Sequence, residues 1–326
     1  MHLRRRKKNP EVPRLIKELY GKIVKGLGGL YETRVVDGDE IRRVACYAKG
    51  VLKRGEEKLL IGDLVKITLD EKTPDSVVIS EVLPRKNALI RPPMSNLDYL
   101  FLVFAAKKPV PVIETVDKLI AIAEHNGIEP VIVITKSDLD PAAALRLREI
   151  YSSVGLHTFV TSSVSAEGTE ELRRYIAKTV TSGNTAAFAG ASGVGKSTLM
   201  NALFPSLALA TGDISRKIER GKHTTRHVEI FEIGEGTDVG FLADTPGFSL
   251  IDFERFDFFE LEDLFASFRD FLPYVGACRY VDCAHVGEGA QDCALARAVA
   301  EGKLQFSRLE SYRSIYKVLK AKSKYD

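Results

Sequence analysis

The chain has 326 residues, of which 45% are hydrophobic and 28% charged, and its formal net charge is +3. This length allows two or three globular domains, each with its own hydrophobic core. No apolar run approaches the roughly 20 residues of a membrane-spanning helix, and the basic N-terminus is not followed by the apolar stretch of a secretion signal. These features exclude an integral membrane protein and predict a cytoplasmic protein with no membrane partner.

The charge is distributed unevenly along the chain. Residues 1–90 hold 20 Lys and Arg against 13 Asp and Glu, a net charge of +7, so residues 91–326 carry −4. A basic end suggests a polyanionic partner. Residues 1–14 are charged and contain two prolines, which predicts a basic flexible arm suited to phosphate contacts. The alternative is a solvated tail that only aids solubility.

Residues 15–90 are predicted to form a small β-barrel of the OB type, because five β-rich segments with alternating patterning follow one another there. Basic side chains lie on and between these segments, and such barrels often bind RNA through a positive face. The alternative is a barrel that serves only as a protein-contact module. The basic residues are Arg34, Arg42, Arg43, Lys49, Lys53 and Arg54.

Residues 91–250 show a different period, after a predicted hinge at Arg91-Pro92-Pro93. Buried strands alternate there with helices, and this alternation specifies a parallel sheet with helices on both faces. The predicted strands are residues 98–106, 130–135, 157–162 and 185–189, with two further strands at 227–233 and 238–243. The predicted helices are residues 113–126, the segment between the cap Asp140 and Gly155, and residues 169–180.

A glycine loop between the last of those parallel strands and a helix start fits the pattern G-x-x-x-x-G-K-[ST], which is typical of phosphate binding. Its backbone N–H groups can converge on phosphate oxygens, and the following helix adds the positive end of its dipole. Lys196 would reach the β- and γ-phosphates, and the Ser197 hydroxyl would hold Mg²⁺. The predicted loop is Gly190, Ala191, Ser192, Gly193, Val194, Gly195, Lys196 and Ser197, followed by Thr198.

A second motif, Thr135-Lys136-Ser137-Asp138, ends an earlier strand and matches [NT]-K-x-D. The Asp138 carboxylate can accept two hydrogen bonds from the ring N–H and exocyclic amine of guanine, whereas adenine offers no such pair of donors. Discrimination of this kind is strong. Ser162 and Ser163, at the end of the next predicted strand, lie where a base-supporting loop is expected. Together these residues predict a GTP-binding site.

The remaining parts of the expected site lie downstream of the glycine loop. Asp244 ends a hydrophobic strand and is placed to act on Mg²⁺, and Gly247 can offer its N–H to the γ-phosphate. Thr224 and Thr225 are candidates for the hydroxyl that senses the γ-phosphate, and Thr225 is assigned to Mg²⁺ together with Ser197 and Asp244.

Two residues of this downstream region concern hydrolysis. Phe248 follows Asp244-Thr245-Pro246-Gly247, where many GTPases place a water-orienting Gln. A phenyl ring cannot hydrogen-bond water, so slow hydrolysis is expected without a partner. His223 is the best internal candidate for positioning the attacking water. The alternative is a surface histidine on a mobile loop.

The order of the motifs is unusual, because the guanine-recognition motif at 135–138 precedes the glycine loop at 190–197. A circular permutation with its break after the Asp244–Gly247 strand explains this order. The segment after Gly247 then leads directly into the C-terminal region.

Residues 251–326 are predicted to form a mostly helical zinc-binding domain. Cys278, Cys283, His285 and Cys293 offer three thiolates and one imidazole, a full tetrahedral set with no open position, so one structural Zn²⁺ is expected. The alternative is a set of buried or reactive thiols. Residues 252–271 are predicted to form an amphipathic helix. A helix with one buried face is expected in residues 303–326, where Phe306, Leu309, Tyr312, Ile315, Tyr316 and Leu319 recur at helical spacing.

The combination of a barrel, a permuted GTPase core and a cysteine-rich C-terminus resembles the ribosome-small-subunit-dependent GTPase A family (RsgA, also called YjeQ or YloQ). The resemblance covers residues 15–326. It implies GTP hydrolysis stimulated by the small (30S) ribosomal subunit, contact with 16S rRNA, and a role in late maturation of that subunit. It also points to His223 as the catalytic residue. We expect the chain to act as a monomer.

Two positions depart from the patterns of known GTPases. Thr135 replaces the usual Asn of the guanine-recognition motif, so the link between this motif and the glycine loop is expected to weaken or change. Gly193 stands where potassium-activated GTPases carry Asn, so no potassium site is inferred. Two other functions are considered: a nucleotide-gated RNA-binding switch with incidental hydrolysis, and an ATP-dependent enzyme, against which Asp138 argues.

Overall fold

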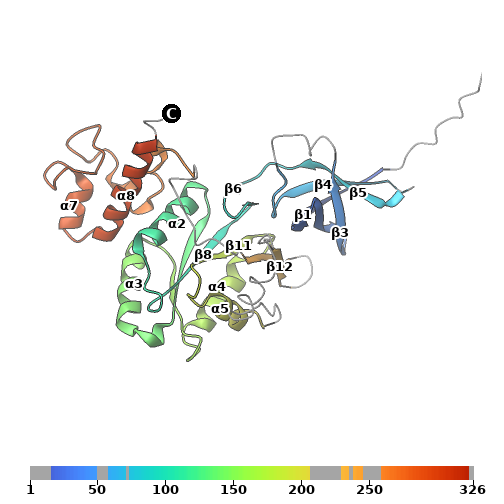
Figure 1. The fold of residues 1–326 in the computed structure, drawn as a ribbon, viewed down its shortest axis with the longest axis horizontal. Helices are drawn as coiled ribbons and strands as arrows, with labels where there is room; N and C mark the ends of the chain where they lie inside the picture. The colour runs from blue at the N-terminus through green and yellow to red at the C-terminus, as the bar shows by residue number, and fades with distance from the viewer. Residues whose placement is uncertain are drawn as a thin grey trace, which may run out of the picture. The chain divides into compact units, whose positions relative to one another are not determined.

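The computed structural model describes residues 16–49, 58–70, 73–205, 229–234, 238–244 and 258–322. It divides into two compact units, the first comprising Met1–Leu59 and Asp63–Pro84, the second Leu60–Gly62 and Arg85–Asp326 (Figure 1). Within the described residues, no helix combines the length and apolar character needed to cross a membrane.

The first unit is a closed barrel of five strands. Strand β1 pairs with β2 and with β4, β2 with β3, and β4 with β5, all antiparallel, while β3 and β5 pair in parallel. The strands are β1 (Ile16–Leu27), β2 (Leu30–Asp37), β3 (Glu40–Ala48), β4 (Leu64–Asp70) and β5 (Thr73–Val82). Side chains that point inward from all five strands form its core, including Ile23, Val35, Cys46, Val65, Ile67 and Ile79. The expectation of an OB-type barrel is confirmed.

The second unit is built on a sheet in which four neighbouring strand pairs are parallel, in the order β10-β9-β8-β11-β13, with β12 antiparallel to β13. The strands are β8 (Tyr99–Ala105), β9 (Glu129–Thr135), β10 (Thr158–Val160), β11 (Thr185–Ala189), β12 (Glu229–Ile233) and β13 (Gly240–Asp244). The helices that accompany them are α2 (Ile113–His125), α3 (Pro141–Ser153), α4 (Thr169–Thr179) and α5 (Lys196–Leu203). The predicted parallel sheet and its helices are thus confirmed.

Strand β8 is buried on both faces, as expected for a central parallel strand. Phe101 and Val103 belong to the core shared with α4 and α5. On the other face, the ring of Phe104 contacts Tyr151 of α3, with ring centroids 5.7 Å apart. The Arg91-Pro92-Pro93 segment lies inside this unit, between the short paired strands β6 (Ala88–Leu89) and β7 (Met94–Ser95).

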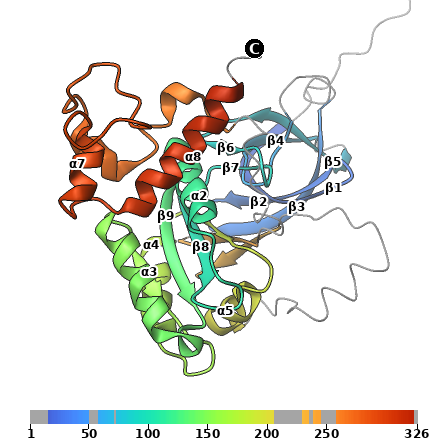
Figure 2. The same cartoon turned by 60° about the vertical axis from the view of Figure 1, so that its left-hand side comes forward.

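The C-terminal part of the second unit contains two short 3₁₀ helices, η3 (Leu261–Asp263) and η4 (Arg269–Tyr274), and the helices α7 (Ala294–Ala300) and α8 (Phe306–Lys322). Helix α8 lies against α2 (Figure 2). The amphipathic helix predicted for residues 252–271 is wrong over its described part, residues 258–271. The reason is tertiary packing, because an extended Phe268 (φ −125°, ψ 90°) lets the rings of Phe265, Phe268 and Phe271 all pack on Tyr312.

The predicted C-terminal helix is present, and its buried face differs from the expected one at four positions. Leu309, Tyr312, Ile315 and Leu319 are buried as expected, but Phe306 is 60% exposed and Tyr316 is only half-buried. The unexpected buried residues are Ser311 and Arg308, and the Arg308 side chain is completely buried.

Arg308 joins α8 to α2 and to η4. Its Nη1 donates to Asp117 Oδ1 of α2 at 2.8 Å, and its Nε and Nη2 donate to the two oxygens of Asp270 at 3.2 and 2.9 Å. The guanidinium carbon also lies 4.5 Å from the centre of the Phe268 ring. Two carboxylates and an aromatic face therefore compensate the buried charge.

A second arginine joins the same surfaces. The Arg269 backbone N–H and Nε donate to Glu124 of α2 at 2.8 and 2.5 Å, and its two Nη atoms donate to the two oxygens of Glu129 at 3.0 and 2.9 Å. Both contacts hold the C-terminal part of the unit against α2 and the start of β9.

We predict that Arg308→Met lowers the free energy of unfolding by about 3–5 kcal/mol, because it leaves Asp117 and Asp270 buried without their cation. Burial raises the pKa of Asp117 and the Arg308 charge opposes that rise. In the variant the pKa rises further, so the folded state takes up a proton more readily than the unfolded state. The stability deficit should therefore shrink as the pH falls from 7 toward 5.

Denaturant unfolding of both proteins across this pH range measures the effect. The matched control is Lys303→Met, which removes a surface ion pair with Glu301 and should leave stability almost unchanged. A deficit below about 1 kcal/mol, or one that is constant with pH, would contradict the role assigned to Arg308.

Candidate nucleotide site and metal centre

The glycine loop and the guanine-recognition motif meet at one edge of the sheet. Strand β11 leads into the glycine loop, β9 into Thr135–Asp138 and β10 into Thr161–Ser163, and all three belong to the parallel part of the sheet. Parallel strands end at the same edge, which is where ligands bind in open α/β sheets. The two motifs are therefore neighbours although more than 50 residues separate Thr135 from Val194.

Three glycines of the loop stand at positions where a side chain would clash or where the backbone is left-handed. A Cβ at Gly190 would lie 2.2 Å from the Val103 carbonyl oxygen of β8, so only glycine fits there. Gly193 and Gly195 have φ of 80° and 94°, in the left-handed region that favours glycine. Helix α5 begins at Lys196, directly after Gly195. Ala191, Ser192 and Thr198 are exposed, while Val194 is buried and anchors the loop in the core.

Thr135 connects the two loops. Its hydroxyl lies 2.5 Å from the carbonyl oxygen of Val194 and 3.3 Å from that of Phe104, and with one proton it donates to the nearer oxygen. The residue is buried, so water does not replace this bond. The replacement of Asn by Thr was expected to weaken or change the link between the loops, and the structure shows a direct contact between the Thr135 side chain and the glycine loop.

Lys136 makes a second connection that the sequence did not predict. Its Nζ donates to the carbonyl oxygen of Gly193 in the glycine loop, at 2.6 Å, and to that of Lys108 in the β8–α2 loop, at 2.5 Å. Its backbone is left-handed, with φ of 55°. The neighbouring Lys107 pairs with Asp140 at 3.4 Å. The β8–α2 loop is therefore fastened to the same motif.

Asp138 is held in place by Ser162. The Ser162 hydroxyl donates to Asp138 Oδ1 at 2.6 Å and accepts the backbone N–H groups of Val164 and Ser165 at 3.2 and 3.3 Å. Ser162 is fully buried, whereas Asp138 is exposed and its second oxygen is available to a base. Ser163 is also exposed. This geometry orients the carboxylate that is predicted to recognise guanine.

Several predicted site residues lie outside the described residues: His223, Thr224, Thr225, Gly247 and Phe248. Asp244 is placed by its backbone alone. It ends β13, in register with Phe188 of β11, two residues before the glycine loop begins. Asp244 therefore lies on the strand next to β11, which leads into the glycine loop at Gly190.

The predicted metal ligands form a compact cluster. The Nδ1 atom of His285 lies 3.5 Å from the sulfurs of Cys278 and Cys283 and 3.4 Å from that of Cys293. Tetrahedral coordination with usual zinc–sulfur and zinc–nitrogen lengths requires nitrogen–sulfur separations of about 3.6 Å. The His285 nitrogen is therefore spaced from the three sulfurs as in a tetrahedral site, and all four ligand atoms lie within 4.8 Å of one another, close enough to hold one metal ion.

Backbone N–H groups donate hydrogen bonds to the sulfurs of two of these cysteines. The N–H of Ala294 donates to the Cys278 sulfur at 3.2 Å, and that of Ala296 donates to the Cys293 sulfur at 3.5 Å. Cys293 caps α7, so the first turn of that helix is directed at the cluster. Burial lowers the pKa of His285, which favours the neutral imidazole that a metal requires.

The basic residues of the barrel are partly engaged with acids. Arg42 pairs with Asp37, and Arg43 pairs with Glu32, both at 2.9 Å. Lys49 is exposed, and Lys53 and Arg54 lie outside the described residues. Exposed pairs of this kind are weak, so an incoming phosphate can compete with their carboxylates.

Comparisons with known proteins agree with this architecture. The RsgA GTPase family model matches residues 82–254, and the RsgA N-terminal domain model matches residues 20–77. A protein from Agathobacter rectalis, named small ribosomal subunit biogenesis GTPase RsgA, is 38% identical over 313 residues, which cover 94% of this chain and 99% of that protein. A protein of the same name from Bacillus pumilus is 37% identical and covers 90% of this chain and 94% of its own length.

Two solved structures are similar over most of the chain. YjeQ from Thermotoga maritima aligns with a TM-score of 0.73 and 32% identity, covering 93% of this chain and 99% of that one. YloQ, described as a circularly permuted GTPase, aligns with a TM-score of 0.72 and 30% identity, covering 94% and 96%.

We predict that Thr135→Val weakens GDP binding about tenfold, because it leaves the buried Val194 carbonyl without its donor, a loss of about 1.4 kcal/mol. Thr135→Ser keeps the hydroxyl and should bind within about twofold of the original protein. Equilibrium titration with a fluorescent GDP analogue measures both. Equal affinities for the valine and serine variants would show that the hydroxyl bond does not support the loop.

Proposed function

Because the chain belongs to the RsgA GTPase family, we propose that it hydrolyses GTP when stimulated by the small ribosomal subunit and acts as a late-stage factor in the biogenesis of that subunit. The observation that carries the proposal is the Asp138 carboxylate, oriented by Ser162 at 2.6 Å beside the glycine loop. It supports a guanine site, and the relatives that match nearly the whole chain are named for biogenesis of the small subunit.

The roles we propose in the nucleotide site follow from the chemistry of the side chains. Backbone N–H groups of Gly190–Ser197 would hold the phosphates, with Lys196 on the β- and γ-phosphates. The hydroxyls of Ser197 and Thr225 and the carboxylate of Asp244 are oxygen donors of the kind that Mg²⁺ prefers. Bound there with GTP, Mg²⁺ would neutralise phosphate charge.

Hydrolysis is proposed to depend on the partner. Phe248 offers no hydrogen bond to water, so His223 or a group supplied by the subunit would position the attacking water. A second candidate function keeps the same site but treats hydrolysis as incidental, so that bound nucleotide only gates docking on RNA. Phe248 is the observation that favours it.

The metal proposed for the C-terminal cluster is one structural Zn²⁺. Three sulfurs and one imidazole nitrogen fill a tetrahedral shell and leave no position for substrate, so the ion would stabilise the fold and not take part in hydrolysis.

For the other partners, we propose 16S rRNA as the polyanion that contacts the barrel and the basic arm. The distribution of charge supports this, because residues 1–90 carry a net charge of +7. We also propose that the chain is a cytoplasmic monomer, organised as an arm (1–14), a barrel (15–90), a permuted GTPase domain (91–250) and a metal-binding domain (251–326).

Multiple-turnover GTP hydrolysis, measured with titrated 30S subunits, 50S subunits and naked 16S rRNA, tests the proposal. We expect stimulation on the order of tenfold or more by 30S subunits alone. His223→Ala should keep GDP affinity and lose the stimulated rate. Stimulation that is absent with 30S subunits would favour the gated switch, and an unchanged stimulated rate in the variant would remove His223 from the mechanism.

A further inference from the structure

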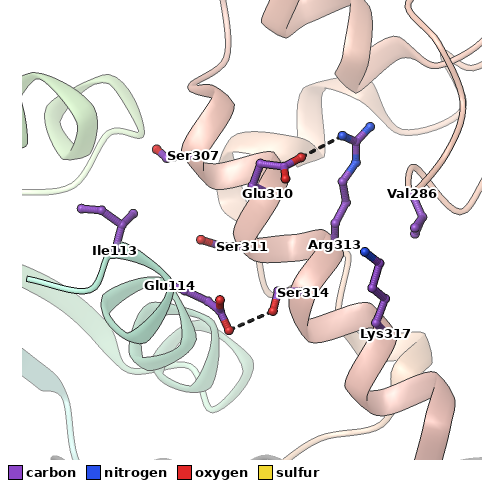
Figure 3. A pocket seen from close by; sticks show the side chains of 9 residues that line it. All are labelled: Ile113, Glu114, Val286, Ser307, Glu310, Ser311, Arg313, Ser314 and Lys317. Atoms are coloured by element: carbon purple, nitrogen blue, oxygen red, sulfur yellow. Dashed lines mark hydrogen bonds and ion pairs between the residues drawn. The ribbon is translucent and has the colours of Figure 1, made fainter.

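The backbone of the metal-cluster histidine is held from outside the cluster by α8. Arg313 Nε donates to the carbonyl oxygen of His285 at 3.0 Å. Its Nη1 donates to Glu310 Oε1, one turn earlier in α8, at 2.9 Å. Figure 3 shows the Arg313 side chain extending from α8 on the side of Val286, the residue after His285. A guanidinium fixed at two points has a defined direction.

His285 adopts a conformation that needs such support. Its φ is 61°, in the left-handed region that is unfavourable for a residue with a side chain. Non-glycine residues persist there only when their surroundings hold them, and such positions cluster at functional sites. The left-handed backbone at this position lets Nδ1 reach all three sulfurs, at 3.4–3.5 Å.

The ring and the backbone of His285 are held by different groups. The ring lies 5.1 Å from the Phe265 ring and 6.1 Å from the Tyr312 ring, measured between centroids. These contacts fix the plane of the imidazole. They do not involve the carbonyl group of His285, whose oxygen accepts a hydrogen bond from the Arg313 side chain.

We propose that Arg313 is a positioning residue for the metal ligand His285, selecting the backbone conformation in which the imidazole completes the cluster. The inference rests on the proposed metal binding and goes beyond it, because it assigns part of the metal affinity to a residue that touches no metal. Groups that orient a ligand in this way commonly change metal affinity 10- to 100-fold when removed.

The same helix also carries Arg308, which is bonded to α2. Arg308 and Arg313 lie five residues apart on α8. Arg308 bonds to Asp117 and Asp270, and Arg313 bonds to the carbonyl oxygen of His285. The segment that contains His285 is thus hydrogen-bonded to the same helix that packs on α2. Helix α8 therefore supplies both the arginine that bonds to α2 and the arginine that bonds to His285.

Cobalt(II) titration of the metal-free full chain tests the proposal, because tetrahedral Co²⁺–thiolate sites absorb visible light and report both affinity and geometry. Competition with Zn²⁺ converts the result to zinc affinity. We expect Arg313→Gln to bind Co²⁺ 10- to 100-fold more weakly, with shifted or weaker visible bands. Arg313→Lys keeps one donor that can reach the carbonyl, so it should recover most of the affinity and the spectrum of the original protein.

Lys303→Gln is the matched control, since it removes an exposed basic side chain of the same C-terminal part whose ion pair is with Glu301. GDP affinity of each preparation reports that the GTPase core is folded. If the original protein does not bind Co²⁺, the metal assignment and this inference both fail. If it binds and Arg313→Gln matches it in affinity and spectrum, the positioning role alone is overturned. Equal losses in the glutamine and lysine variants would also overturn the role of the hydrogen bond.

Discussion

The parallel pairing of β11 with β8, and of β8 with β9, is the constraint on which the nucleotide site depends. It brings the ends of these strands to one edge, whatever the order in which the chain visits them. A circular permutation can therefore reverse the order of the two motifs without changing their geometry. The Thr135 hydroxyl and the Lys136 ammonium then tie the motifs together through the carbonyl oxygens of Val194 and Gly193. The parallel pairing thus brings the two motifs together, and these side-chain hydrogen bonds fix them to each other.

Much of this arrangement follows from local sequence. The strands of the barrel and of the parallel sheet have strong periodicity, and the start of α3 is marked by Asp140, whose side chain accepts the N–H of Ala143. Residues 258–271 could not be predicted in the same way. Their aromatic residues have a spacing compatible with a helix, but the rings pack on Tyr312, which lies about 40 residues away in the chain. The burial of Arg308 could not be predicted either, because its partner Asp117 lies 191 residues away in the chain.

At the candidate site, sequence reasoning found residue types and missed their mutual support. It placed Asp138 and Ser162 in the same site, but the bond between them required β9 and β10 to be paired. It expected the link at Thr135 to weaken or change, and only the close approach of the Val194 carbonyl shows that the Thr135 hydroxyl reaches the glycine loop. The four metal ligands were recognisable from their spacing, whereas Arg313 was not, because an arginine on an amphipathic helix carries no signal of a backbone contact.

The account as a whole requires that Asp138 selects guanine through the edge of the base that carries the ring N–H and the exocyclic amine. Equilibrium binding of GDP and XDP to the original protein and to Asp138→Asn tests this most directly, because xanthine replaces the amine with a carbonyl that an asparagine amide can satisfy. The original protein should prefer GDP, and the variant should lose GDP affinity by at least about a hundredfold and prefer XDP. An unchanged preference for GDP in the variant would contradict the assignment of the guanine site.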